Sequence, residues 1–380
     1  MKKKICVVTS SRADYNHLFI LLESLKKSQR FDLKVIITGM HTLTSYGNTY
    51  KEVIKDGFTD NIIIRTNQKN TDQKNILNSM STQLNKSYSA IEKINPDIMI
   101  VLGDRYDMYP FALASHIMNK PLVHIHGGEV TAGVIDDAIR HSVSKLADIH
   151  FVANDEFKKR LVQMGERKKY IYNIGSLGID AIKKMRFKNR KYINSILKQL
   201  IDKKYFMISL HPETLTSNNS KLVSNVLKSL DSFKDYIKIF SYPNSDTNGE
   251  IIMREIKHYT KNNQNSLITP SFGRIDYLHL LKYSEVLIGN SSSGLVEAPY
   301  LGTPTVDVGE RQKGRPKSNS IFSANLSVSS IKSNIKGALN FKKNNKNVKY
   351  QGINSIHKIL NVLEKIDLHD IKKKSFVDIA

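Results

Sequence analysis

The sequence predicts an α/β protein of two domains, each built on a parallel, doubly wound sheet. Short apolar runs rich in β-branched residues alternate with helical patterns, as in chains with buried parallel strands. This alternation stops at residues 174–191, a glycine-containing and strongly basic stretch, and restarts at residue 204. The length of 380 residues also exceeds the usual range of a single domain.

In the first half, five apolar runs predict buried strands at 5–9, 33–38, 97–103, 121–126 and 148–153. Helical patterns separate several of them, at 15–27, 76–94 and 156–165, and a further helix opens at 134–148. We therefore expect a first domain at 1–175.

The second half repeats this arrangement. Strands are expected at 204–210, 236–242, 266–270, 285–289 and 303–309, with helices at 222–233, 277–284 and 353–366. We place the second domain at 176–366, and the tail at about 367–380 is a candidate to pack back on the first domain. Two such domains facing each other would form a cleft at the carboxyl ends of their strands, where ligands bind in such sheets.

Composition excludes some classes of function. The single cysteine, Cys6, rules out an internal disulfide framework and suits a reducing cytoplasm. The apolar run after the basic start is too short for a secretory signal, and no later run is long enough to span a membrane. The net charge of +23 raises nucleic-acid binding as an alternative, but the lysines are scattered without a basic-aromatic motif. We expect a cytoplasmic protein without nucleic-acid or membrane partners.

Polar residues follow the strands of the first half. Arg12 follows strand 5–9 and is placed to bind an anion, while Asp104 and Arg105 follow strand 97–103. Glu129 lies in "HIHGGEVTAG" after the next strand, and Asp136 lies near the start of the helix expected at 134–148. Taken alone, that helix start could simply carry surface ion pairs and acids that favour the helix dipole. Because these carboxylates follow adjacent strands, they are expected to converge.

The two histidines of "HIH" raise the possibility of a metal. His124 and His126 are two apart on the expected strand, so their side chains would point the same way and could ligate an ion. No further Cys/His set completes a metal site, and neither a P-loop nor a dinucleotide fingerprint is present. We expect neither a metal nor a cofactor.

The second half offers an acid/base candidate and a phosphate loop. His211 stands directly at the end of strand 204–210, either as an acid/base group or as a packing histidine. "GNSSSG" at 289–294 joins a strand end to a helix, where serine hydroxyls and free N–H groups could hold a phosphate; alone, it could equally be a polar turn. Glu297 is placed to bind ribose hydroxyls, and the basic loop 310–317 would complete the site.

The motifs "SRADY", "TGMH", "LGDRYD", "HIHGGEV", "DDAIRHSVSKLA", "HPET", "GNSSSG" and "GERQKGR" occur in this order. As a set, they resemble the hydrolysing UDP-N-acetylglucosamine 2-epimerases of bacterial sialic-acid synthesis over residues 4 to about 320. That family has two facing Rossmann-like domains, the GT-B architecture. Non-hydrolysing and vertebrate relatives carry glutamate at the position of His126, so this departure favours the hydrolysing branch and leaves His126 without an acid/base role.

The resemblance implies catalytic roles for Asp104, Glu129, Asp136 and His211. It implies contacts with a UDP-sugar substrate for a larger set of residues: Arg12, Arg105, Asn244, Tyr277, Ser291, Ser292, Glu297 and Arg311. It also implies elimination of UDP through a 2-acetamidoglucal, addition of water, and a homodimer or homotetramer.

Two alternatives stay open. A glycosyltransferase of the same fold would use the nucleotide loop but would not need the "HGGE" and "DDAIRH" acids. A close branch of the resembled family acts on UDP-N,N'-diacetylbacillosamine for legionaminic acid, and the sequence does not identify the residues around carbons 4 and 6 of the sugar.

Overall fold

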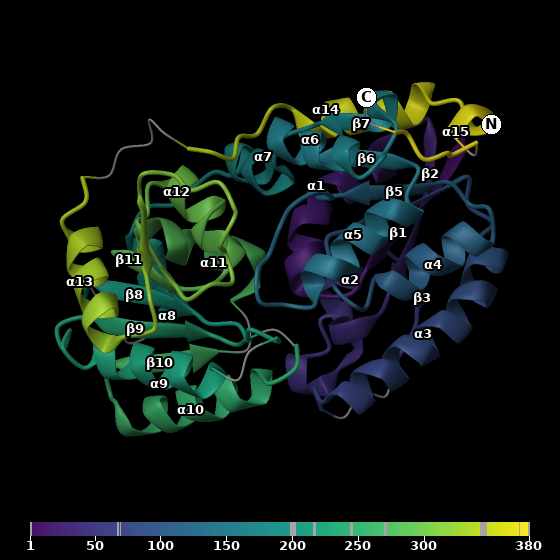
Figure 1. The fold of residues 1–380 in the computed structure, drawn as a ribbon. Helices are drawn as coiled ribbons and strands as arrows, with labels where there is room; N and C mark the ends of the chain where they lie inside the picture. Colours follow the sequence, from purple (N-terminus) through teal and green to yellow (C-terminus); the bar gives the residue numbers. More distant parts are fainter. Residues whose placement is uncertain are drawn as a thin grey trace. The chain divides into compact units, whose positions relative to one another are not determined.

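The computed structural model describes residues 2–378 except 67, 69, 198–202, 216–217, 244–245, 270–271, 343–347 and 372. The chain divides into two compact units (Figure 1). Unit 1 comprises residues 1–129, 135–181 and 351–380, and unit 2 comprises residues 130–134 and 182–350. Each unit contains one all-parallel sheet with helices on its faces, so the expected fold class is confirmed.

Within the described part of unit 1, seven strands form a sheet in the order β3-β2-β1-β4-β5-β6-β7. Their bounds are β1 Lys3–Thr9, β2 Phe31–Ile37, β3 Asn61–Ile63, β4 Ile98–Leu102, β5 Leu122–Ile125, β6 Ile149–Val152 and β7 Ile171–Asn173. The α-helices are α1 Arg12–Lys27, α2 Tyr50–Lys55, α3 Gln73–Ile94, α4 Tyr109–Ile117, α5 Asp136–Leu146, α6 Asp155–Gln163, α7 Leu177–Lys184, α14 Ser355–Lys365 and α15 Leu368–Ile371. Helix α7 ends just inside the segment that begins unit 2.

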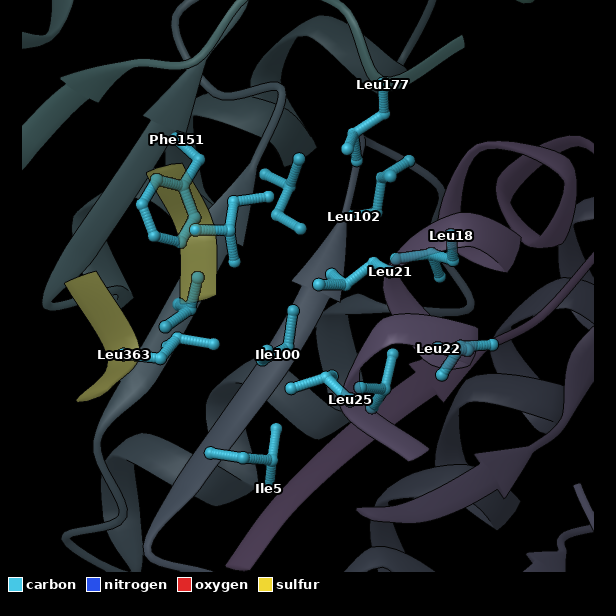
Figure 2. Close-up of a cluster of buried hydrophobic side chains, with 14 of the residues drawn as sticks. Ile5, Leu18, Leu21, Leu22, Leu25, Ile100, Leu102, Phe151, Leu177 and Leu363 are labelled. Carbon is cyan, nitrogen blue, oxygen red and sulfur yellow. The ribbon is translucent and has the colours of Figure 1, made fainter. Parts of the chain in front are cut away.

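The sheet of unit 1 is buried on both faces, which explains why its central strands read as nearly continuous apolar runs. Leu21 and Leu25 of α1 pack with Ile100 of β4 on one face (Figure 2). Leu363 of α14 belongs to the same cluster, as does Phe151 of β6, so the end of the chain completes the core of unit 1. The helix expected at 353–366, assigned by sequence to the second domain, thus lies in unit 1.

In the described residues of unit 2, six parallel strands are ordered β10-β9-β8-β11-β12-β13. Their bounds are β8 Tyr205–Ser209, β9 Ile237–Ser241, β10 Ser266–Thr269, β11 Val286–Gly289, β12 Thr305–Val308 and β13 Ile321–Ala324. The helices are α8 Lys191–Leu197, α9 Asn219–Leu230, α10 Gly249–Asn262, α11 Gly273–Tyr283, α12 Glu297–Leu301 and α13 Val328–Leu339. None of the helices in the described ranges is long and apolar enough to cross a membrane.

The strand order of each sheet reverses at one point. In unit 1 the reversal falls between β1 and β4, and in unit 2 between β8 and β11. The loops leaving two such neighbouring strands go to opposite sides of the sheet, which opens a crevice at their carboxyl ends. The loops at these switch points carry Arg12 and Asp104 in unit 1, and His211 and the "GNSSSG" segment in unit 2.

Candidate active site

The turn from β1 into α1 is tightly capped and positions Arg12. Asp14 accepts hydrogen bonds from the backbone N–H groups of Ser10 and Ser11, both at 2.7 Å. Arg12 is therefore the first residue of α1, three residues before the start expected from the apolar period. Burial lowers the pKa of the Arg12 guanidinium, and the nearby carboxylate of Glu52 opposes that effect. A partly desolvated cation of this kind is a strong binder of phosphate.

The loop after β4 places its two predicted residues differently. Asp104 forms an ion pair with Arg140 of α5, whose side chain is 2% exposed. Arg105 is held by the fully buried Asp107, with its Nη2 atom 3.0 Å from Oδ2. The ion pair joins Asp104 to α5, the helix that also carries Asp136. These are two of the acids that were expected to converge.

Asp136 is the first residue of α5, where free backbone N–H groups favour a negative charge. The residue is 3% exposed. Its neighbour Asp137, whose side chain is 37% exposed, lies 3.9 Å from the buried Arg140 and 3.7 Å from His141, whose pKa is lowered by burial. Asp136 is therefore a buried acid, whereas its neighbour Asp137 is half-exposed.

The loop after β5 holds Glu129, which is 6% exposed. Its Oε1 atom lies 2.8 Å from Nδ1 of His126. The expectation that His124 and His126 point the same way is wrong, because β5 ends at Ile125 and His126 adopts a positive φ of 66°. His124 instead bonds Ser144 and the carbonyl of Gly103, and burial lowers its pKa to about 3, which keeps it neutral.

In unit 2, the buried side chain of Asn290 ties the two loops of the switch point together. The backbone N–H of His211 donates to Asn290 Oδ1 at 2.7 Å, and Asn290 Nδ2 donates to the carbonyl of His211 at 2.9 Å. The imidazole Nε2 of His211 lies 3.3 Å from the hydroxyl of Ser209. The absence of a side chain at Gly289 allows the end of β11 to lie close to the end of β8, because a Cβ at position 289 would lie 2.0 Å from the carbonyl oxygen of Ser209.

The "GNSSSG" segment forms a 3-10 turn over Ser292–Gly294, and Ser291 caps that turn by accepting a bond from the N–H of Ser293. Ser292 is exposed. Tyr277 of α11 contacts Ser293, and burial, with the charge of Glu297 adding to it, raises the pKa of the tyrosine. The segment therefore brings an exposed hydroxyl, a capped turn and a buried acid together.

The basic loop after β12 is joined to this segment. Arg311 Nη1 and Gln312 Nε2 donate to the carbonyl of Asn290 at 3.1 and 2.7 Å. Glu213, of the "HPET" motif, accepts the backbone N–H groups of Glu310 and Arg311 at 3.0 and 3.2 Å. Predicted residues His211 and Arg311 are thus brought together through Asn290.

Five positioning residues were not predicted from the sequence: Asp14, Arg140, Glu213, Asn290 and Gln312. All are buried polar residues inside motifs that were recognised, and a polar residue within such a motif was the available signal. Asn244 lies outside the described residues. Within the described ranges, no group of three or more His, Cys, Asp and Glu side chains is arranged to hold a metal ion.

Comparison with known proteins decides the family. A family model described as UDP-N-acetylglucosamine 2-epimerase matches residues 23–364. The chain belongs to this epimerase family. It is 39% identical over 328 residues to a Campylobacter jejuni protein named GDP/UDP-N,N'-diacetylbacillosamine 2-epimerase (hydrolyzing), covering 86% of this chain and 85% of the relative. It is 37% identical to the Escherichia coli polysialic acid biosynthesis protein P7, covering 87% and 84%.

Solved structures of other epimerases show the same fold. The crystal structure of the Neisseria meningitidis UDP-GlcNAc 2-epimerase bound to UDP-GlcNAc matches with a TM-score of 0.77 at 15% identity, covering 96% of this chain and all of the other. At this identity the likeness concerns the fold alone. The resemblance to a hydrolysing 2-epimerase and the two-domain α/β fold expected from the sequence are both confirmed.

Proposed function

We propose that this epimerase hydrolyses UDP-N-acetylglucosamine to free N-acetylmannosamine and UDP, as a first step toward sialic acid. One observation carries the proposal: buried or ion-paired carboxylates of Asp104, Glu129 and Asp136 follow adjacent strands at one sheet edge. A glycosyltransferase needs the nucleotide loop but has no use for such a set. The relatives named as hydrolysing and as polysialic acid biosynthesis proteins support the same reaction.

The reaction explains the requirement for several acids. The proton on carbon 2 of the sugar is not adjacent to a carbonyl, so the C1–O bond to UDP must break as that proton leaves. A carboxylate takes the proton and the electron pair forms the double bond of a 2-acetamidoglucal. Water then adds its hydroxyl at carbon 1, and a proton returns to carbon 2 from the opposite face. Inversion therefore needs proton-transfer groups on both faces, which Glu129 or Asp136 and His211 would supply.

The departing diphosphate develops negative charge that must be stabilised. Arg12, Arg311 and the hydroxyl and N–H groups at Ser291 and Ser292 would serve this purpose. Glu297 would bind the ribose hydroxyls and Tyr277 would lie near the uracil, while Arg105 and Asn244 remain candidates for the substrate. The reaction needs no metal and no nicotinamide cofactor.

UDP-N,N'-diacetylbacillosamine is the second candidate substrate. The Campylobacter relative is named for that sugar at 39% identity, whereas the polysialic acid relative stands at 37%. Sequence identities this close do not indicate which of the two sugars is the substrate. Equal amounts of the two UDP-sugars in one reaction would decide between them, because the sugar with the higher kcat/KM is consumed first.

The test of the reaction is identification of the products by proton NMR in the presence of EDTA. We expect free N-acetylmannosamine and UDP at an unchanged rate. A product that stays attached to UDP, or turnover abolished by EDTA, would contradict the proposal.

We also propose a homodimer or homotetramer acting in the cytoplasm. The long helix α3 exposes Leu77, Leu84 and Tyr88 at 64%, 38% and 54%, all on one side at helical spacing. A second copy of the chain would cover this stripe. Light scattering should show a smaller particle for Leu84→Glu than for wild type, and an unchanged oligomer would remove α3 from the interface. The buried, unpaired Cys6 is consistent with a reducing cytoplasm.

A further inference from the structure

His126 has a backbone conformation that is uncommon for a residue other than glycine. Its φ of 66° lies in the left-handed region, which costs an ordinary L-residue about 1 kcal/mol or more. Asparagine and glycine occupy that region more readily, and among the described residues the other non-glycine positions with positive φ are all asparagines. A histidine kept in this conformation requires surroundings that fix it.

The loop after β5 and its contacts with β6 and α6 provide these surroundings. The His126 N–H donates to the carbonyl of Phe151 at 2.8 Å, which continues the pairing of β5 with β6 by one residue. Gly128, with φ of 76°, lies so close to α6 that a Cβ would be 2.5 Å from the Phe157 carbonyl oxygen. Arg160 of α6 donates to the Gly128 carbonyl. The segment from His126 to Glu129 is therefore held rigidly against unit 1.

The strained conformation directs the imidazole toward Glu129. Nδ1 lies 2.8 Å from Glu129 Oε1, and the two side chains are only 16% and 8% exposed. An ionised carboxylate accepts hydrogen bonds and cannot donate them, so Nδ1 carries the proton. The ring of His17 from α1 lies against the same imidazole at a centroid distance of 5.8 Å. Both the orientation and the tautomer of His126 are thus set.

We propose that His126 is a positioning residue that holds the Glu129 carboxylate in place for proton transfer at carbon 2. The inference rests on the proposed function, and it assigns the proton transfer to Glu129 in place of Asp136. A hydrogen bond from a rigid neighbour limits the rotation of a catalytic carboxylate, and loss of such a supporting partner costs roughly 10–100-fold in activity. His126 acts through its Nδ1–H, and its Nε2 atom takes no part in the reaction.

Asparagine and aspartate at position 126 form a matched pair of variants. Both tolerate a positive φ, but only His126→Asn places an N–H donor at the position of Nδ1. We expect His126→Gly, which removes the donor without adding charge, to lower kcat roughly 10–100-fold with KM nearly unchanged, and His126→Asp, which also repels the Glu129 carboxylate, to lower it at least as much. We expect His126→Asn to retain most of the wild-type kcat. Thermal melting of each variant identifies any that fails to fold, and the Asn/Asp comparison remains informative if the glycine variant is lost.

Two results would overturn the inference. If His126→Asp and His126→Gly turn over like wild type, the hydrogen bond does not matter. If His126→Asn is as impaired as His126→Asp, Nε2 itself is needed and His126 is not acting through Glu129. In a Glu129→Gln background, the His126→Asp substitution should cause no further loss, because the two residues act as a unit. A fully active Glu129→Gln enzyme would instead refute the role proposed for Glu129.

Discussion

Asn290 organises the nucleotide half of the site through both its side chain and its backbone carbonyl. Its amide group bonds both backbone polar groups of His211, and its own carbonyl receives Arg311 and Gln312. Because the residue is fully buried, water cannot replace these bonds if they are lost. The histidine predicted for acid/base chemistry and the arginine predicted for the diphosphate therefore depend on the same residue.

Glu297 provides the residue-scale prediction for UDP. Its side chain is largely buried at the start of α12, next to Tyr277, so a ribose hydroxyl bonded there would displace little water. Glu297→Ala should weaken UDP binding by about 1–3 kcal/mol, the range for a charge-assisted hydrogen bond. Calorimetric titration with UDP measures this. The control is Glu255→Ala on the exposed surface of α10, and equal affinities for the two variants would count against the assignment.

At the scale of single residues, the sequence singled out candidate acid/base and anion-binding residues but not the residues that support them. Asp104 and His211 stand directly after the apolar runs expected as strands, and Glu129 lies in the loop after the next one, so these positions are readable from the hydrophobic period. Arg140 and Glu213 were not predicted, because their importance comes from long-range partners: Asp104 for the first, and the backbone of residues 310 and 311 for the second. The left-handed conformation of His126 was not expected, because neither its hydrogen bond to Glu129 nor the close packing of Gly128 on α6 is visible in an alternating strand pattern.

The elements of unit 1 are held at one end by a buried charge cluster around Glu166. Lys145 of α5 and Lys374 of the C-terminal tail each lie 2.7 Å from its carboxylate, and His150 of β6 lies 3.0 Å away. Lys374 also donates to the carbonyl of Lys145 at 2.7 Å, which caps the C-terminal end of α5. The tail from residue 373 onward therefore connects to the helix that begins with Asp136.

The cluster makes stability depend on pH. Burial raises the pKa of Glu166, but the hydrogen bond from His150 and the contacts with Lys374 and Lys145 outweigh burial and lower the pKa to about 2 from an ordinary 4.5. A depressed carboxyl pKa stabilises the fold above the unfolded value, and this contribution is lost as pH falls from about 4.5 to 2. Burial lowers the pKa of His150 against the opposing effect of Glu166, so neutral His150 also favours the fold at higher pH.

Glu166→Gln should therefore lower the free energy of unfolding at pH 7 by about 3 kcal/mol, because the buried lysine Lys374 loses its counter-charge. The deficit relative to wild type should shrink as the pH approaches 3. Urea unfolding at several pH values measures it, with the exposed Glu156→Gln on α6 as control. A deficit that does not change with pH would show that the charge of Glu166 is not its source.

Element prediction succeeded where a strand is buried on both faces. The central strands β1, β4 and β5 and their unit 2 counterparts β8 and β11 were all expected from apolar runs. The short edge strands β3, β7 and β13 were not expected, because a strand of three or four residues shows little period and depends on its neighbour for pairing. The sequence analysis assigned α14 to the second domain, although α14 lies in unit 1. The contacts that place it there, such as those of Leu363, are with residues far away in the sequence.

For the whole molecule, one topology occurs twice. Each sheet reverses its strand order next to the first strand of its unit, and the predicted acids and anion-binding groups follow the strands at or beside these reversals. Alternation of strands and helices predicts such sheets, but it does not predict the order of the strands, because that order depends on non-local pairing. The central claim of the proposed function is that a carboxylate of unit 1 removes the proton from carbon 2 of the sugar.

Turnover in deuterium oxide tests this central claim most directly. If a carboxylate removes the carbon-2 proton and a solvent-derived proton returns, the free N-acetylmannosamine must carry deuterium at carbon 2, which proton NMR detects. Glu129→Gln and Asp136→Asn should each lower the rate by roughly 10²–10⁴-fold with UDP binding largely intact. A glycosyltransferase or a simple hydrolase never breaks that C–H bond. Product without deuterium at carbon 2 would therefore contradict the epimerase mechanism.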